Sequence, residues 1–86
     1  MRSFTYTIKD PEGVHARPAG MLCKTCKAML PTKVTLTKGE ETVSCTKILA
    51  IMGMGIKTGE TVTVTVEGGN EEANCAAMEQ FFKENL

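Results

Sequence analysis

Thr61-Val62-Thr63-Val64-Thr65-Val66-Glu67 is the stretch that decides the fold. Valine alternates with threonine along it, and this period of two gives a β-strand one apolar face and one polar face. Such a strand covers a core with one side and meets water with the other. The stretch therefore predicts a sheet with one buried face.

Six further elements are expected around this strand, in the chain order β-α-β-β-α-β-α. Alternation and turn residues predict strands near residues 4–8, 34–36 and 43–45. Apolar residues at helical spacing predict helices from about 16 to 29, from about 47 to 54, and from 71 onward. These patterns predict an α+β fold in which helices cover one face of an antiparallel sheet.

The two longer helices should each turn an apolar side toward that sheet. For the first helix we expect Ala19, Leu22, Cys23, Cys26 and Leu30 on this side, and for the last helix Ala73, Ala77, Met78, Phe81 and Phe82. Asn70 is expected to cap the last helix. With 86 residues and no linker or repeat, residues 1–86 are expected to form one domain.

Composition excludes several classes of function. Ten basic and ten acidic residues give zero net charge, so a general nucleic-acid binder is not expected. No stretch approaches the roughly 18 apolar residues of a membrane span. The N-terminal residues lead directly into a strand pattern and show no apolar signal region, which predicts a cytoplasmic protein. We expect it to be a monomer without a cofactor.

Four cysteines allow a second interpretation. Cys23 and Cys26 form a C-x-x-C pair, which occurs in thiol redox proteins and metal sites. Both cysteines fall inside the expected first helix, where helix-terminal amides cannot activate a thiol. Cys45 and Cys75 stand alone. We expect all four to fill the core in a reducing compartment, with a thiol or metal module as the alternative.

The only histidine, His15, lies in the run Gly13-Val14-His15-Ala16-Arg17-Pro18-Ala19. Pro18 is tolerated best in the first turn of a helix, so His15 is expected at the helix N-terminus. The free backbone N–H groups of Ala16 and Arg17, with the Arg17 guanidinium, would stabilise a phosphoryl group on the imidazole. A surface or capping histidine is the alternative. No metal site is expected, since no second histidine, carboxylate or thiol stands at ligand spacing beside His15.

This run resembles the active-site signature of HPr, the histidine-containing phosphocarrier family of the phosphoenolpyruvate-dependent sugar phosphotransferase system. Two further stretches are similar to HPr segments: Ile48 to Gly55 to its second helix and the glycine after it, and Thr61 to Gly68 to its last strand and turn. The resemblance implies an open-faced β-sandwich of four strands and three helices. It also implies a stoichiometric carrier, not a turnover enzyme, which is phosphorylated on Nδ1 of His15 with help from Arg17.

The resemblance also implies partners, namely enzyme I as phosphoryl donor, enzyme IIA domains as acceptors, and regulatory proteins. Two surfaces are candidates for docking them. The first is a flank of the first helix that carries Arg17, Gly20, Lys24 and Lys27. The second is an outward apolar cluster, Ile48, Leu49 and Met52, beside Lys47. A regulatory HPr-like protein that binds a transcription factor or a metabolic enzyme is the alternative, and the intact His15 and Arg17 favour the carrier.

Two positions depart from the family pattern. Glu12 stands where many members have a small polar residue, and its carboxylate is expected to repel a phosphoryl group nearby. Lys47 aligns with the serine that a dedicated kinase phosphorylates in many Gram-positive members. Lysine has no hydroxyl, so we expect no phosphoserine switch, although Ser44 and Thr46 offer hydroxyls close by. Thr46 is also a candidate cap for the short helix.

Overall fold

The computed structural model describes residues 1–86 and confirms the expected order of elements. The strands are β1 (Arg2–Thr7), β2 (Lys33–Lys38), β3 (Glu41–Ser44) and β4 (Thr61–Glu67), and the helices are α1 (Ala16–Ala28), α2 (Ile48–Gly53) and α3 (Glu71–Asn85). No helix combines the length and the hydropathy needed to cross a membrane.

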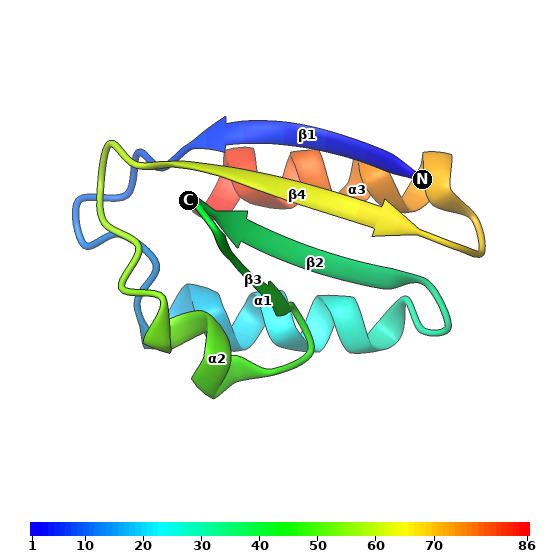
Figure 1. Ribbon diagram of the computed structural model, residues 1–86, viewed down its shortest axis with the longest axis horizontal. Coiled ribbons are helices and arrows are strands. Elements are labelled where there is room, and N and C mark those ends of the chain that lie inside the picture. The colour runs from blue at the N-terminus through cyan, green and yellow to red at the C-terminus, as the bar shows by residue number, and fades with distance from the viewer.

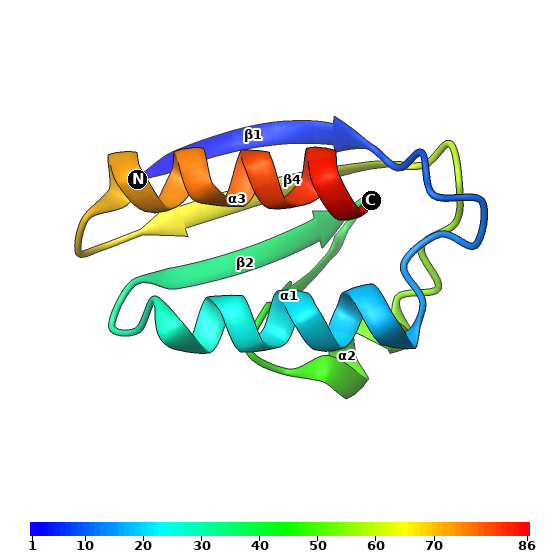
Figure 2. The same cartoon turned by 180° about the vertical axis from the view of Figure 1, so that it is seen from behind.

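The four strands form one antiparallel sheet in the order β1-β4-β2-β3. Val64 of β4 lies between Phe4 of β1 and Leu36 of β2, so the apolar side chains of the three strands share one face. All three helices contribute to the core on that face, and α1 and α3 lie side by side in antiparallel directions (Figures 1 and 2). The α+β open-faced sandwich is confirmed.

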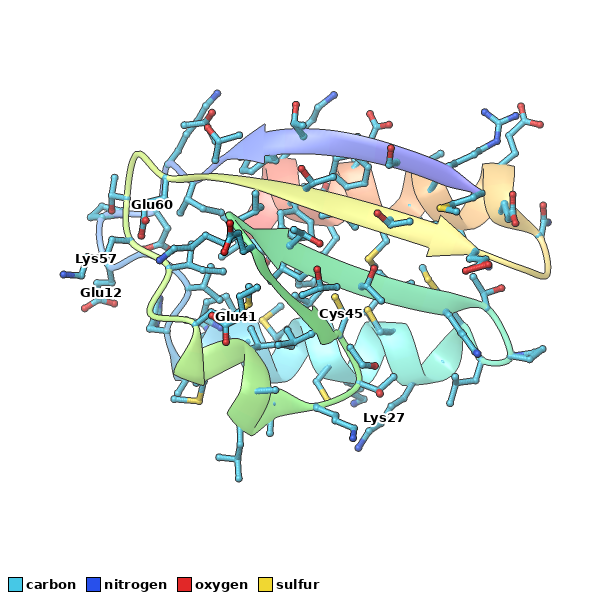
Figure 3. All side chains as sticks on the ribbon, in the orientation of Figure 1. Glu12, Lys27, Glu41, Cys45, Lys57 and Glu60 are labelled. Carbon is cyan, nitrogen blue, oxygen red and sulfur yellow. The ribbon has the colours of Figure 1, made fainter.

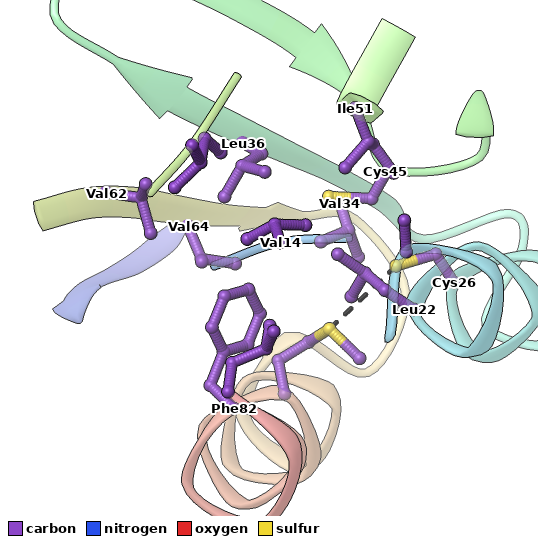
Figure 4. Close-up of a cluster of buried hydrophobic side chains, with 14 of the residues drawn as sticks. Val14, Leu22, Cys26, Val34, Leu36, Cys45, Ile51, Val62, Val64 and Phe82 are labelled. Atoms are coloured by element: carbon purple, nitrogen blue, oxygen red, sulfur yellow. Dashed lines mark hydrogen bonds between the residues drawn. The ribbon is translucent and has the colours of Figure 1, made fainter. Parts of the chain in front are cut away.

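The core lies between the sheet and the helices (Figure 4). Each helix contributes a fully buried side chain to it, Leu22 from α1, Ile51 from α2 and Phe82 from α3. The ring of Phe82 makes edge contacts with Phe4 and Tyr6 of β1, at centroid distances of 5.8 and 5.6 Å. Full burial of such a side chain stabilises the fold by about 1.5–3 kcal/mol, so the Phe82 contacts hold α3 at a fixed place on the sheet.

Some expected core positions were wrong. Leu30 is exposed because α1 ends at Ala28 and the chain has already turned toward β2. Ala73 and Ala77 are exposed, since α3 rotates the face of Cys75, Met78 and Phe82 toward the sheet.

At the start of two helices the structure differs from the expected capping. Asn70 is the N-cap residue of α3, but its side chain makes no capping hydrogen bond. Lys47, not Thr46, is the N-cap residue of α2, and it makes no capping hydrogen bond either.

All four cysteines are buried, free thiols, as expected of core-filling residues. The Cys23 thiol donates to the Thr46 carbonyl oxygen at 3.1 Å, and the Cys26 thiol contacts the Met78 sulfur at 3.8 Å. A hydrogen bond with Cys26, together with burial, raises the pKa of the Cys45 thiol. These contacts join α1 to α3 and to the segment before α2, which is a structural use of the C-x-x-C pair.

Candidate functional site

His15 is the N-cap residue of α1. Its backbone is extended, with φ −99° and ψ −175°, and its carbonyl oxygen accepts the N–H of Ala19 at 3.0 Å. The imidazole makes no capping hydrogen bond. The N–H groups of Ala16 and Arg17 have no backbone acceptor, and Pro18 has no N–H at all. This helix end therefore presents two free amide donors beside an imidazole that does not cap them.

The loop before His15 is fixed against the segment that leads into β4. The N–H of Val14 donates to the Ile56 carbonyl oxygen at 3.0 Å, and the Thr58 hydroxyl donates to the Asp10 carbonyl oxygen. Gly13 has φ +69°, and a Cβ there would come within 2.4 Å of the same Ile56 oxygen. Only glycine allows this approach, so the position of His15 depends on it.

Two carboxylates face His15. Nε2 lies 3.6 Å from Oδ2 of Asp10 and 3.4 Å from Oε2 of Glu12. Asp10 is held in place because its Oδ1 accepts the backbone N–H of Glu12 at 2.8 Å. The expectation that no carboxylate lies at ligand spacing from His15 was therefore wrong, because the turn at Pro11 folds residues 10–12 back onto the imidazole. Together the three residues offer ligand atoms within 4.8 Å of one another, the arrangement that a divalent cation would need.

An open pocket of about 240 Å³ adjoins the imidazole. It is lined by Asp10, His15, Arg17, Pro18, Met21, Glu84 and Asn85. The last two residues come from the C-terminal turn of α3, which lies near the N-terminus of α1 because the helices are antiparallel (Figure 2). Arg17 is exposed and forms no ion pair within the chain, so its guanidinium is free to meet an anion in the pocket.

Four pocket residues were missed in the sequence. Asp10 faces His15 only because the turn at Pro11 folds back, and nothing local connects Glu84 or Asn85 with His15. Met21 could have been found, since it lies four residues after Arg17 and therefore on the same side of the helix. Its side chain is 41% exposed.

The two candidate docking surfaces meet. Lys24, Lys27 and Lys47 are all exposed, and Lys27 is visible on α1 near the start of α2 in Figure 3. A Cβ on Gly20 would lie 3.5 Å from the Ile48 side chain, so α1 and α2 are in close contact at this point. The helices thereby join the basic flank to the apolar cluster in one continuous surface.

The apolar cluster on α2 is exposed as expected. Leu49 is 82% exposed, Met52 40% and Ile48 36%, while Ile51 is fully buried. The short helix can bury only one side against β3 and α1, which leaves these three side chains in solvent.

Residues 2–84 match a protein-family model described as the PTS HPr component phosphorylation site. The chain belongs to the HPr family. It is 33% identical over 86 residues to the phosphocarrier protein HPr of Mycoplasma genitalium, covering 99% of this chain and 97% of the relative. It is 31% identical over 80 residues to HPr of Mycoplasma capricolum, covering 93% and 89%.

Solved HPr structures show the same fold. A histidine-containing phosphocarrier protein of Mycoplasma superposes with a TM-score of 0.90 at 29% identity, covering 96% of this chain and 93% of that one. An HPr from Thermoanaerobacter tengcongensis gives 0.90 at 28% identity, covering 98% and 93%. As a member of this family the protein is a phosphocarrier.

Proposed function

We propose that this HPr-family protein relays a phosphoryl group from enzyme I to enzyme IIA domains, and that Nδ1 of His15 carries it. It would act as a stoichiometric carrier in the cytoplasm, loaded and discharged by its partners. The observation that supports this most directly is the His15 imidazole, which makes no capping hydrogen bond and stands beside the free N–H groups of Ala16 and Arg17.

The carrier itself needs few catalytic groups for this transfer. Phosphoryl transfer depends mainly on positioning and on stabilising the charge of the phosphoryl oxygens. The amides at the start of α1 and the positive end of its dipole can stabilise these oxygens in the phosphorylated form. The Arg17 guanidinium adds a mobile donor from the same turn. Moderate stabilisation is useful here, since a phosphoryl group held too tightly could not be passed on.

The continuous surface on α1 and α2 suits partners that pass a phosphoryl group to or from His15. Its exposed apolar side chains would form the centre of an interface, and its lysines would form a basic rim. Both partners must bring their own active-site group to the same imidazole, so the same surface would serve enzyme I and the enzyme IIA domains in turn. Adaptable side chains such as Met52 suit such repeated use.

The test is to incubate the protein with phosphoenolpyruvate and enzyme I and to measure its intact mass before and after mild acid. We expect the mass of one phosphoryl group, lost in acid. His15 is the only histidine, so His15→Ala should gain nothing while it keeps its circular dichroism spectrum. An equal gain of mass in His15→Ala would contradict the proposal. Adding an enzyme IIA domain to the loaded protein should then remove the label.

A further inference from the structure

The two carboxylates beside His15 face the nitrogen that is not expected to carry the phosphoryl group. Oδ2 of Asp10 and Oε2 of Glu12 both lie within ion-pair distance of Nε2. An ionised carboxylate only accepts hydrogen bonds. A neutral imidazole has one N–H and one lone pair, and the partner of one nitrogen decides which nitrogen holds the proton. Two negative charges facing Nε2 favour the proton there.

Asp10 is well placed for this task because its surroundings fix it. Its side chain accepts the N–H of Glu12, its own N–H donates to the Leu86 carbonyl oxygen at 2.8 Å, and its carbonyl oxygen accepts the N–H of Gly13 at 2.9 Å and the hydroxyl of Thr58. The Asp10 side chain is only 23% exposed, whereas the Glu12 side chain is 73% exposed. Asp10 is therefore the more rigid of the two, and Glu12 adds a second negative charge.

We propose that Asp10, assisted by Glu12, is a positioning residue that keeps the neutral His15 imidazole protonated on Nε2, which leaves the Nδ1 lone pair free for the phosphoryl group and eases its later discharge. This inference rests on the proposed function for the discharge step. The tautomer is a property of the unphosphorylated protein, so this part of the inference does not depend on the proposed function. Arg17 and Glu84 are the other charged groups that line the pocket.

The transfer steps balance without a separate proton donor. In loading, the Nδ1 lone pair forms the N–P bond, the bond between phosphorus and the donor breaks, and the donor keeps that electron pair. The ring then carries a positive charge, with its proton still on Nε2 facing the two carboxylates. In discharge, the N–P bond breaks and its electron pair returns to Nδ1, while the phosphoryl group passes to the acceptor nitrogen or to water. The ring leaves as neutral imidazole.

The role of Glu12 thus differs from simple repulsion of the phosphate. Its carboxylate approaches Nε2, which is the ring nitrogen that is not expected to form the N–P bond. There it stabilises the proton that makes the imidazole a neutral leaving group. A phosphorylated form with these carboxylates should lose its phosphoryl group faster than one without them.

The first experiment reads the tautomer directly. ¹⁵N NMR of the unphosphorylated, labelled protein at about pH 9, where a free imidazole is neutral, distinguishes a protonated ring nitrogen from an unprotonated one, and the single histidine leaves no ambiguity of assignment. We expect Nε2–H in the original protein. In Asp10→Asn/Glu12→Gln the new amide oxygen at position 10 can still accept the backbone N–H of residue 12. This turns the NH₂ of the same amide toward Nε2 and should shift the population toward Nδ1–H.

The second experiment measures loss of phosphate from the isolated, phosphorylated proteins. We expect about a threefold to tenfold slower loss in Asp10→Asn/Glu12→Gln, consistent with the loss of two negative charges beside Nε2. Glu41→Gln is the matched control, because Glu41 is an exposed carboxylate on β3 that lies outside the pocket and forms no ion pair with His15. It should change neither the tautomer nor the rate.

The outcomes separate the two proposals. An unchanged tautomer in the double variant, or an equal change in Glu41→Gln, would overturn the role of Asp10 and Glu12. A changed tautomer with an unchanged rate of phosphate loss would overturn their role in discharge. If the original protein gains no phosphoryl group on His15, the proposed function fails, while the NMR result still decides the tautomer.

Discussion

The backbone N–H of Val14 donates to the carbonyl oxygen of Ile56 at 3.0 Å. This bond ties the residue before His15 to the segment before β4, across nearly half of the chain. Both side chains are buried, Val14 with 8% and Ile56 with 3% of its surface exposed. The reactive loop is therefore anchored in the core on one side and continues into α1 on the other.

Gly13→Ala should weaken this anchor. Residue 13 has φ +69°, and the new Cβ would clash with the Ile56 oxygen. Because this oxygen belongs to the backbone, it can move away only if the chain itself shifts. We expect a loss of about 1–3 kcal/mol in the free energy of unfolding, measured by urea denaturation, together with slower phosphorylation. Gly53→Ala is the control, since its φ is not positive and nothing lies within 4 Å of a Cβ there. Equal stability of the two variants would contradict the anchoring role of Gly13.

Arg17→Ala should slow phosphoryl transfer by about tenfold or more, because it removes a charged donor from the pocket beside His15. The thermal unfolding transition should remain, since the side chain is exposed and forms no ion pair within the chain. Rapid-quench assays with enzyme I and with an enzyme IIA domain give the rates. Lys33→Ala serves as control, because Lys33 is an exposed basic residue on β2 outside the docking surface. Unchanged rates with both partners would remove Arg17 from the mechanism.

Leu49→Glu should weaken partner binding by about tenfold or more, because Leu49 is the most exposed member of the apolar cluster. Its effect on the free energy of unfolding should stay within about 0.5 kcal/mol, as for other exposed positions. Titration calorimetry with enzyme I provides the affinity. Leu30→Glu tests whether any exposed leucine behaves in the same way. Leu30 is 56% exposed and lies just after the C-terminus of α1. Equal losses in both variants would count against a docking surface on α2.

Glu60→Gln should change how stability depends on pH. Glu60 and Lys57 lie in the segment before β4 (Figure 3). The backbone N–H of Lys57 at 2.7 Å, and then the ammonium of Lys38, lower the pKa of the Glu60 carboxyl. A carboxyl with a lowered folded-state pKa contributes stability above its unfolded pKa, and this contribution is lost as the pH falls through the folded value. The variant should therefore be less stable near pH 7 and approach the original protein in acid.

Thermal melts at several pH values measure this difference between the Glu60→Gln variant and the original protein. Glu41→Gln is the control, because Glu41 is exposed and forms no ion pair. A constant difference between Glu60→Gln and the original protein at every pH would show that the ionised carboxylate is not responsible.

The protein should lack a phosphoserine switch at the start of α2. Lys47 is the N-cap residue there and carries no hydroxyl. The nearest hydroxyls, on Ser44 and Thr46, hydrogen-bond each other at 2.8 Å and are half-buried, which limits access to them. Incubation with the kinase of Gram-positive HPr proteins and ATP should leave no stoichiometric acid-stable phosphate. Mapping such a label to either hydroxyl would show that the acceptor has moved along the chain.

The sequence by itself determined the elements and the nature of the candidate nucleophile. Alternation of valine and threonine specifies β4, because only an extended chain places alternate residues on one face. Pro18 limits α1 to a start close to His15 for an equally local reason, the missing N–H. The outward cluster on α2 also followed from the sequence, since a short helix that is apolar on all sides cannot bury every side chain.

Tertiary structure decided what surrounds His15. The approach of Asp10 to Nε2 depends on the loop being pinned by Ile56, Thr58 and Leu86, which lie far away in the sequence. Glu84 reaches the pocket only because α3 runs antiparallel to α1 on the same sheet face (Figure 2). The exposure of Ala73 and Ala77 likewise depends on how α3 rotates when Phe82 packs against β1. Such contacts arise from long-range packing, which local periodicity does not encode.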